Sequence, residues 1–179
     1  MKRLLCALAL VAFAAAPALA DPKSDVTAAM IQFAKASSYH MEIDSKRGAM
    51  EADFAAPGKM HVSSPQFEMI KIDATTWVKI GGKWQQFAMP GMDQMTGAFS
   101  TAVATVKSQS DDMVVTDLGM KSPAAGGRPL HAYTVINNAG KIPSTLFLDG
   151  GRLSEVDNAD GSSVKFSKFD APVDIEPPM

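Results

Sequence analysis

Cysteine is nearly missing from this chain, since Cys6 is the only one among 179 residues. Cys6 lies in a leader that we expect to be cleaved. The remaining chain can then form no disulfide, thiolate metal site or cysteine nucleophile. Lysine and arginine are scattered and form no basic stripe, which argues against a nucleic-acid partner. After residue 16 no apolar run is long enough to cross a bilayer.

The first twenty residues have the pattern of a secretory signal. A positive start over Met1–Arg3 precedes an apolar run over Leu4–Ala16 and an Ala-x-Ala site over Ala18–Ala20. We therefore predict a cleavable signal over 1–20 and a mature chain that begins at Asp21. Loss of the two basic leader residues changes the formal net charge from −2 to −4. The predicted location is the periplasm, with no transmembrane segment after cleavage.

Recognisable catalytic and metal-binding motifs are also missing. The sequence has no nucleophile elbow, no glycine-rich phosphate loop and no close pair of histidines at metal-ligand spacing. The three histidines, His40, His61 and His131, are far apart, and we interpret them as isolated surface residues. These absences favour a binding protein over an enzyme and predict no cofactor.

Apolar periodicity predicts one helix followed by many strands. Val26, Met30 and Phe33 recur at helical spacing after Ser24, a candidate N-cap, in a helix that should end near Ser37. From Tyr39 onward the pattern changes to period two, with short turns rich in glycine, asparagine and aspartate. Short connections predict antiparallel pairing in a meander. No repeat or linker divides the chain, so we expect a single domain over 21–179.

The clearest predicted hairpin joins Thr75–Ile80 to Lys83–Phe87 through Gly81-Gly82. In this register Trp77 and Trp84 lie diagonally on one face of the hairpin. The opposite face is also partly apolar, so neither face is expected to be simply solvated. Upstream, Phe67 and Met69 lie on one phase and Ile70 and Ile72 on the other. This indicates either a bulge or a strand buried on both faces.

A second helix is predicted over Met92–Lys107, where the strand pattern stops. Met92, Met95, Phe99 and Val103 share one face of this helix, which must pack across the sheet. Met89, Met92 and Met95 also allow an alternative hypothesis, a Cu(I) site of thioether ligands. The helical stripe continues to Phe99 and Val103, so packing is the favoured interpretation.

The order of elements resembles the periplasmic half-barrel superfamily of the lipoprotein carrier LolA and the related mycobacterial lipid-binding lipoproteins. The segments that carry this resemblance are a hairpin containing Gly48, Pro57–Val62, Thr76–Lys79, Tyr133–Val135, Leu146–Asp149 and Phe166–Pro178. The resemblance implies a mainly β fold with a few helices, in which a strongly curved antiparallel half-barrel sheet carries helices across its concave face. It also implies that acyl chains are held between the sheet and the helices.

A cavity for acyl chains needs apolar, adaptable walls, and methionine suits this role. The predicted lining residues are Met50, Phe54, Met60, Met69, Trp77, Trp84, Met92, Met95, Phe99 and Val103. The sequence thus predicts a non-catalytic carrier or chaperone whose ligand is a lipid or an acylated protein. An envelope sensor on the same fold, acting through an envelope protein partner, remains an alternative, as does the copper site.

Overall fold

The computed structural model describes residues 21–87, 112–137 and 143–179. The predicted signal over 1–20 and the predicted helix over Met92–Lys107 lie outside these residues, as does the alternative copper ligand Met89. The signal, the second helix and the copper site therefore stay predictions. The described part contains one helix, α1, and one sheet of eleven strands.

The element bounds are α1 (Pro22–Lys35), β1 (Ser38–Asp44), β2 (Met50–Ala55), β3 (Lys59–Ser63), β4 (Glu68–Ile72), β5 (Thr75–Ile80), β6 (Lys83–Phe87), β7 (Met113–Lys121), β8 (Leu130–Asn137), β9 (Pro143–Asp149), β10 (Arg152–Asn158) and β11 (Ser163–Ser167).

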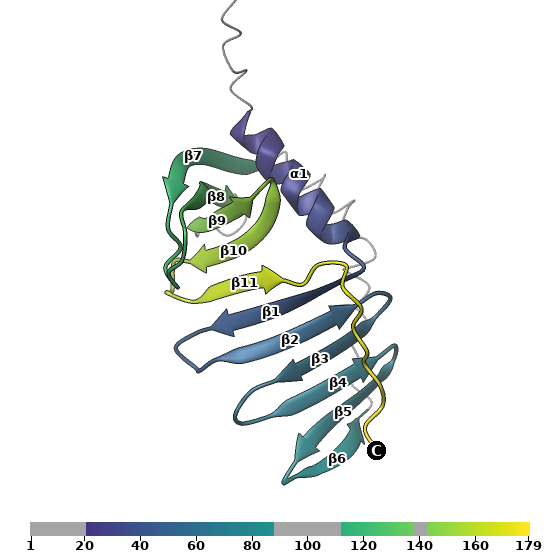
Figure 1. The fold of residues 1–179 in the computed structure, drawn as a ribbon. Helices are drawn as coiled ribbons and strands as arrows, with labels where there is room; N and C mark the ends of the chain where they lie inside the picture. The colour runs from purple at the N-terminus through teal and green to yellow at the C-terminus, as the bar shows by residue number, and fades with distance from the viewer. Residues whose placement is uncertain (1–20, 88–111, 138–142) are drawn as a thin grey trace, which may run out of the picture.

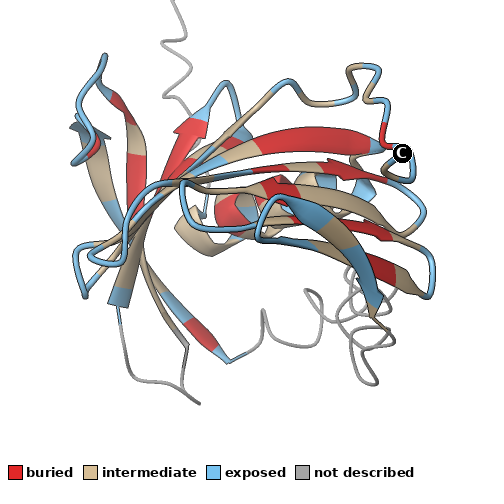
Figure 2. Ribbon diagram, turned by 90° about the horizontal axis from the view of Figure 1, so that it is seen from below, coloured by how far each residue is buried: buried red, intermediate tan, exposed pale blue. Residues whose placement is uncertain are grey.

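Two meanders meet in the middle of this sheet (Figure 1). The strand order is β6-β5-β4-β3-β2-β1-β11-β10-β9-β8-β7, and every neighbouring pair is antiparallel. The two meanders are joined by β1 and β11, which pair from His40↔Ser167 to Asp44↔Ser163. The sheet curves without closing into a barrel, and α1 packs across its concave face, as the half-barrel prediction requires (Figure 2).

The two faces of the sheet have different covers. On the concave side, Val26 and Ala29 of α1 pack on Tyr133, Leu146 and Leu153 of the sheet, and we call this side the helix face. On the other side, the C-terminal tail, residues 171–179, runs across β2, β4, β5 and β6 (Figure 1). We call this side the tail face. Because strand residues alternate between faces, the strand register assigns every side chain to one of them.

Helix α1 begins earlier than its sequence pattern suggests. Its N-cap is Asp21, whose carboxylate accepts a hydrogen bond from the Lys23 backbone N–H at 3.3 Å, and Pro22 occupies the first turn. The Ser24 cap was therefore wrong, because an Asp-Pro pair supplies both a capping oxygen and a proline φ suited to the first turn. The predicted apolar face is confirmed, since Val26 is buried and Met30 and Phe33 pack against the same cluster.

The predicted strands are confirmed with small changes at their ends. The hairpin of β5 and β6 has the expected register, Lys79↔Trp84 and Trp77↔Gln86. Gly81 and Gly82 both have positive φ, +58° and +78°, as a primed two-residue turn requires. Strand β4 is buried on both faces and has no register shift, which decides between the two interpretations of its phase.

Candidate ligand-binding face

A patch of methionines occupies the helix face of β1 to β4. Met41, Met50, Met60 and Met69 pack with Ala52, Val62 and Val78 into one apolar cluster. Ala52, Val62 and Met69 are buried, while the other three methionines are half-buried. We call this set the methionine patch. It is separate from the cluster under α1, which packs mainly against β7 and β10.

An aromatic cluster lies between the patch and the helix. Phe33, near the end of α1, has its ring centroid 4.7 Å from that of Tyr39 and 4.9 Å from that of Phe166. Phe54 stacks on Tyr39 at 4.9 Å. Burial raises the pKa of Tyr39, so its hydroxyl stays protonated within this cluster. The helix face is thus continuously apolar from the core under α1 to the methionine patch.

The predicted cavity residues do not all lie together. Met50, Phe54, Met60 and Met69 share the helix face, and their place in a cavity stays a prediction. The two tryptophans lie on the tail face, so including them in the same cavity was wrong. Strand phase explains this, because Trp77 pairs with Ile70, whereas Met69 pairs with Val78.

The tryptophans have a different covering element. Trp77 and Trp84 pack with Ile70, Val173 and Ile175 under the C-terminal tail. A period-two signal was present in the sequence, since Val173 and Ile175 are two residues apart in the proline-flanked tail. The remaining predicted lining residues, Met92, Met95, Phe99 and Val103, lie outside the described residues.

Two polar side chains interrupt the helix face beside the methionine patch. Lys71 pairs with Met60 on one side and Thr76 on the other, and both Lys71 and Thr76 are about 1% exposed. The Lys71 ammonium donates a hydrogen bond to the Asp73 carbonyl oxygen. Because a buried ammonium must keep its hydrogen-bond partners, the Lys71 side chain is held in place at the edge of an apolar surface.

The histidines were predicted to be isolated surface residues, but none of the three is isolated. His40 is buried, and its Nδ1 lies 2.7 Å from Asp53 Oδ1. His61 Nε2 lies 3.1 Å from Glu68 Oε1, and His131 Nε2 lies 2.8 Å from Asp117 Oδ1. The first two pairs are on the tail face and the third is on the helix face. Cross-strand spacing creates all three pairs, which sequence separation conceals.

Hydrogen bonds to the acidic partners shift their pKa values. The Lys79 ammonium, 2.8 Å from Glu68 Oε2, is the largest cause that lowers the pKa of Glu68, and His61 adds to it. The Gly119 backbone N–H and His131 lower the pKa of Asp117. Within the described ranges, no three acidic, histidine or cysteine side chains are close enough to hold a metal ion.

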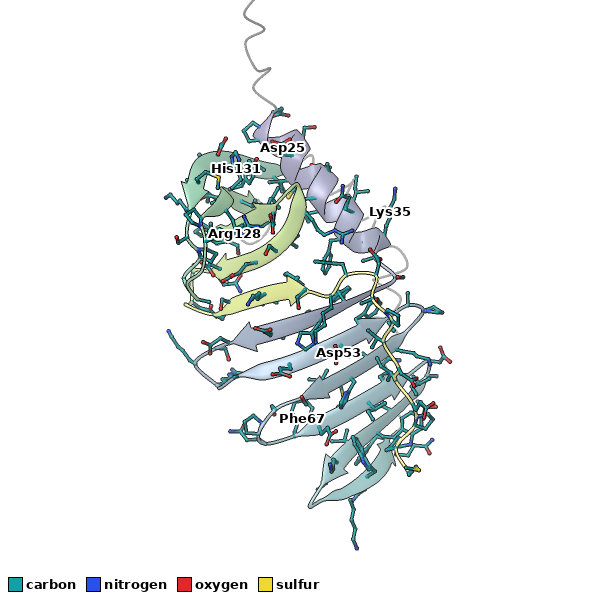
Figure 3. The ribbon with its side chains drawn as sticks, viewed as in Figure 1. Asp25, Lys35, Asp53, Phe67, Arg128 and His131 are labelled. Atoms are coloured by element: carbon teal, nitrogen blue, oxygen red, sulfur yellow. The ribbon has the colours of Figure 1, made fainter. Side chains whose placement is uncertain are left out.

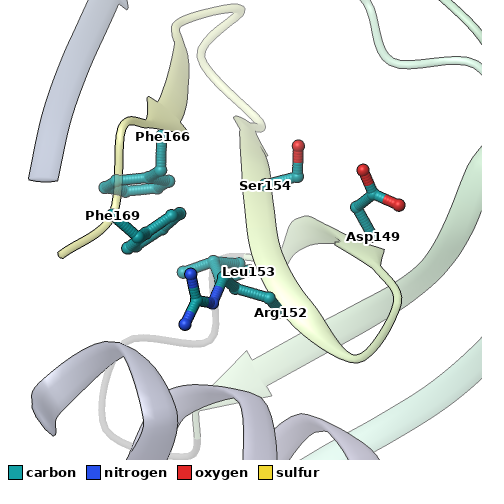
Figure 4. Close-up of a pocket in the computed structure, with 6 residues that line it drawn as sticks. All are labelled: Asp149, Arg152, Leu153, Ser154, Phe166 and Phe169. Atoms are coloured by element: carbon teal, nitrogen blue, oxygen red, sulfur yellow. The ribbon is translucent and has the colours of Figure 1, made fainter. Parts of the chain in front are cut away.

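A small pocket opens where β10 and β11 diverge (Figure 4). Its volume is about 160 Å³, and Asp149, Arg152, Leu153, Ser154, Phe166 and Phe169 line it. The Arg152 guanidinium lies 4.8 Å from the Phe169 ring centroid and pairs with Asp170 at 3.3 Å. This pocket is smaller than most small-molecule sites, and its arginine is already paired, so it is not the predicted acyl cavity.

A solved structure has the same architecture. LprF from Mycobacterium bovis matches this chain with a TM-score of 0.55 and 15% sequence identity, over 88% of this chain and 96% of LprF. The chain has the fold of LprF. A LolA superfamily protein from Nitrosomonas europaea also matches, with a TM-score of 0.31 and 10% identity, over 85% of this chain and 94% of that protein. No family model and no curated protein matches the sequence.

None of the helices in the described segments of this chain has the length and apolarity needed to span a bilayer. The sheet presents two different surfaces, a helix face rich in methionine and a tail face covered by the C-terminal tail. The helix face is therefore the candidate ligand-binding face.

Proposed function

We propose that this protein is a non-catalytic periplasmic binding protein or carrier. Its ligand would be the acyl groups of a lipid or lipoprotein, held against the helix face. The methionine patch carries this proposal, because it is a contiguous apolar surface of flexible, polarizable side chains on the concave side of an open sheet. The resemblance of the sequence to the LolA half-barrel superfamily and the predicted signal add support. A protein partner in the envelope would donate or receive the ligand.

The arrangement of polar groups favours binding over catalysis. Each histidine ring in the described part of the chain is hydrogen-bonded to a carboxylate rather than to a serine or threonine hydroxyl that could act as a nucleophile. Burying methylene groups would drive binding without covalent chemistry, at roughly 0.8 kcal/mol each.

Adjacent residues on β3 provide a matched test. Met60 belongs to the methionine patch, whereas His61 points to the opposite face. Met60→Gln places an amide against the acyl chain, and an unpaired buried amide costs about 1–3 kcal/mol. We expect the affinity for a fluorescent fatty acid to fall about tenfold or more. His61→Gln should leave that affinity unchanged.

Native mass spectrometry of the mature protein, before and after organic extraction, gives an independent measurement. A bound acyl ligand that disappears on extraction is expected. A protein that is always empty, and that also takes up no fluorescent fatty acid, would exclude the carrier function. Equal losses of affinity in both β3 variants would instead mean that the methionine patch is not the binding surface.

A further inference from the structure

Strand β10 carries two carboxyl groups side by side in a buried place. Glu155 and Asp157 are two residues apart, so both point to the tail face. Glu155 is only 3% exposed. Glu155 Oε1 and Asp157 Oδ1 are both buried, and neither has a hydrogen-bond partner in the described part of the protein. Buried oxygens without partners are rare and require an explanation.

The same two carboxyls hold the loop that joins β7 to β8, residues 122–129. The Ala124 backbone N–H donates to Asp157 Oδ2 at 2.9 Å, and the Ala125 backbone N–H donates to the Glu155 carboxyl. Within the loop, the Gly126 N–H donates to the Pro123 carbonyl oxygen at 3.0 Å. The loop is thus attached to the sheet through this acidic pair.

The neighbouring elements supply too little positive charge for two ionised carboxylates. Lys165 of β11 faces Glu155 in the register, but its ammonium is also 3.7 Å from Glu42 of β1. On the other side, β9 places Phe147 opposite Glu155, within an apolar cluster. Arg128, the cation of the loop, is paired with Asp149.

A proton held by this pair turns one carboxyl into a hydrogen-bond donor to the other. Asp157 Oδ2 still accepts from the Ala124 N–H in this state. The surroundings favour this state: burial is the largest cause that raises the pKa of Glu155, and both the charge of Asp157 and a hydrogen bond to it raise the pKa further.

We propose that Glu155 and Asp157 share one proton, and that this pair is a pH-sensitive latch for the loop over 122–129. When the pair loses its proton, two adjacent buried carboxylates repel each other and release the loop from β10. The latch lies on the tail face of the meander formed by β7 to β11, so it does not depend on the proposed ligand function.

The direction of the pH effect follows from the raised pKa of Glu155. The folded protein binds this proton more tightly than the unfolded chain does. The stabilisation is therefore complete below the ordinary glutamate pKa and is lost as the pH rises through the folded value. In this range, release of one proton increases the open fraction of the loop about tenfold per pH unit.

Glu155→Gln tests the latch in the intact protein. Glutamine has the same shape, and its amide NH₂ donates permanently to Asp157. We expect the melting temperature and the exchange protection of the Ala124 and Ala125 amides to lose the pH dependence that the unaltered protein shows above the ordinary glutamate pKa. Asp157→Asn should have the same effect. Glu51→Gln, at an exposed carboxyl on the same face, is the control and should keep the original pH dependence.

Two results would overturn this proposal. One is an unchanged pH dependence in both Glu155→Gln and Asp157→Asn. The other is a rise in melting temperature on adding calcium at alkaline pH that both variants abolish, because a cation would then occupy the place assigned to the proton. A carbon-13 titration of the Glu155 carboxyl in the unaltered protein, with an ordinary glutamate pKa, would also exclude a shared proton.

Discussion

At the scale of single residues, Tyr133 connects the helix to the sheet. Its hydroxyl donates to Asp25 Oδ2 at 3.0 Å, and its ring stacks on His131 at 4.7 Å. Figure 3 shows Asp25 and His131 at the same end of the molecule, where α1 begins. Burial and Asp25 raise the pKa of Tyr133 to about 12, so the hydroxyl remains a donor throughout the physiological range.

Tyr133→Phe should destabilise the protein by about 1 kcal/mol, because it removes this hydrogen bond and leaves Asp25 without its buried partner. Urea unfolding at neutral pH measures the loss. Tyr39→Phe is the matched control, since the Tyr39 hydroxyl has no hydrogen bond within the described ranges and should contribute less. Equal losses in the two variants would show that ring packing, rather than the bond to Asp25, determines the stability.

The raised pKa adds a further expectation: Tyr133 stabilises the fold below pH 10, and this effect is lost as the pH rises through about 12.

Residue-level features were the hardest to predict from the sequence. Local chemistry identified the turn glycines, Gly81 and Gly82. The three histidine–carboxylate pairs depend on which strands become neighbours, and no local pattern contains that information. Glu155 and Asp157 are neighbours on one strand, but the sequence does not show that the loop over 122–129 packs on them. Asp117 and His131, for example, are close only because β7 and β8 pair with a register shift between Asp117 and Gly119.

At the scale of elements, the C-terminal tail acts as a second cover for the sheet. Ile175 is 3% exposed and packs on Ala55 and Ile70, although the tail forms no strand. The Lys59 ammonium donates to the Ile175 carbonyl oxygen at 3.2 Å, which fixes the tail across β3. Helix and tail thus bury opposite faces of one sheet, as a layered architecture requires.

Ile175→Ala should cost about 2 kcal/mol, the lower end for a buried isoleucine, because the tail can partly relax. The chain has only two tryptophans, and both lie under the tail. The variant should therefore show a red-shifted tryptophan emission already in the folded state. Glu176→Ala, at an exposed neighbour, should change neither quantity. Unchanged emission in Ile175→Ala would mean that the tail does not cover the tryptophans in solution.

The helix and strands were predicted better than the face of the sheet on which each side chain lies. Period-two patterns located the strands, and the two glycines fixed the register of the β5–β6 hairpin. The error came from placing the two tryptophans in the same cavity as Met69, although both faces of these strands were expected to be partly apolar. Strand β4 is apolar on both faces, so the phase of Met69 and that of Trp77 could not be assigned to the same side without knowing that the tail covers one of them.

At the scale of the whole molecule, the sheet depends on pairing between segments that are far apart in the sequence. Strand β1 pairs with β11, so the two meanders become one sheet only when residues more than a hundred positions apart come together. Such non-local pairing predicts slow folding. The predicted ligand surface lies in the meander of β1 to β6, and the acidic latch lies in the meander of β7 to β11. The two proposals therefore concern separate parts of the sheet.

Saturated fatty acids of increasing chain length test the assignment of the ligand to the helix face. Each added methylene that reaches the methionine patch should strengthen binding by roughly 0.8 kcal/mol, about fourfold in affinity. At a free ligand concentration about one hundred times Kd, the stabilisation is about 2.7 kcal/mol, which calorimetry detects as a higher melting temperature.

A brominated fatty acid should bind equally well without quenching tryptophan emission, because the sheet separates Trp77 and Trp84 from the methionine patch. Strong quenching would place the ligand on the tail face instead, and an affinity independent of chain length would show that the acyl chain is not buried.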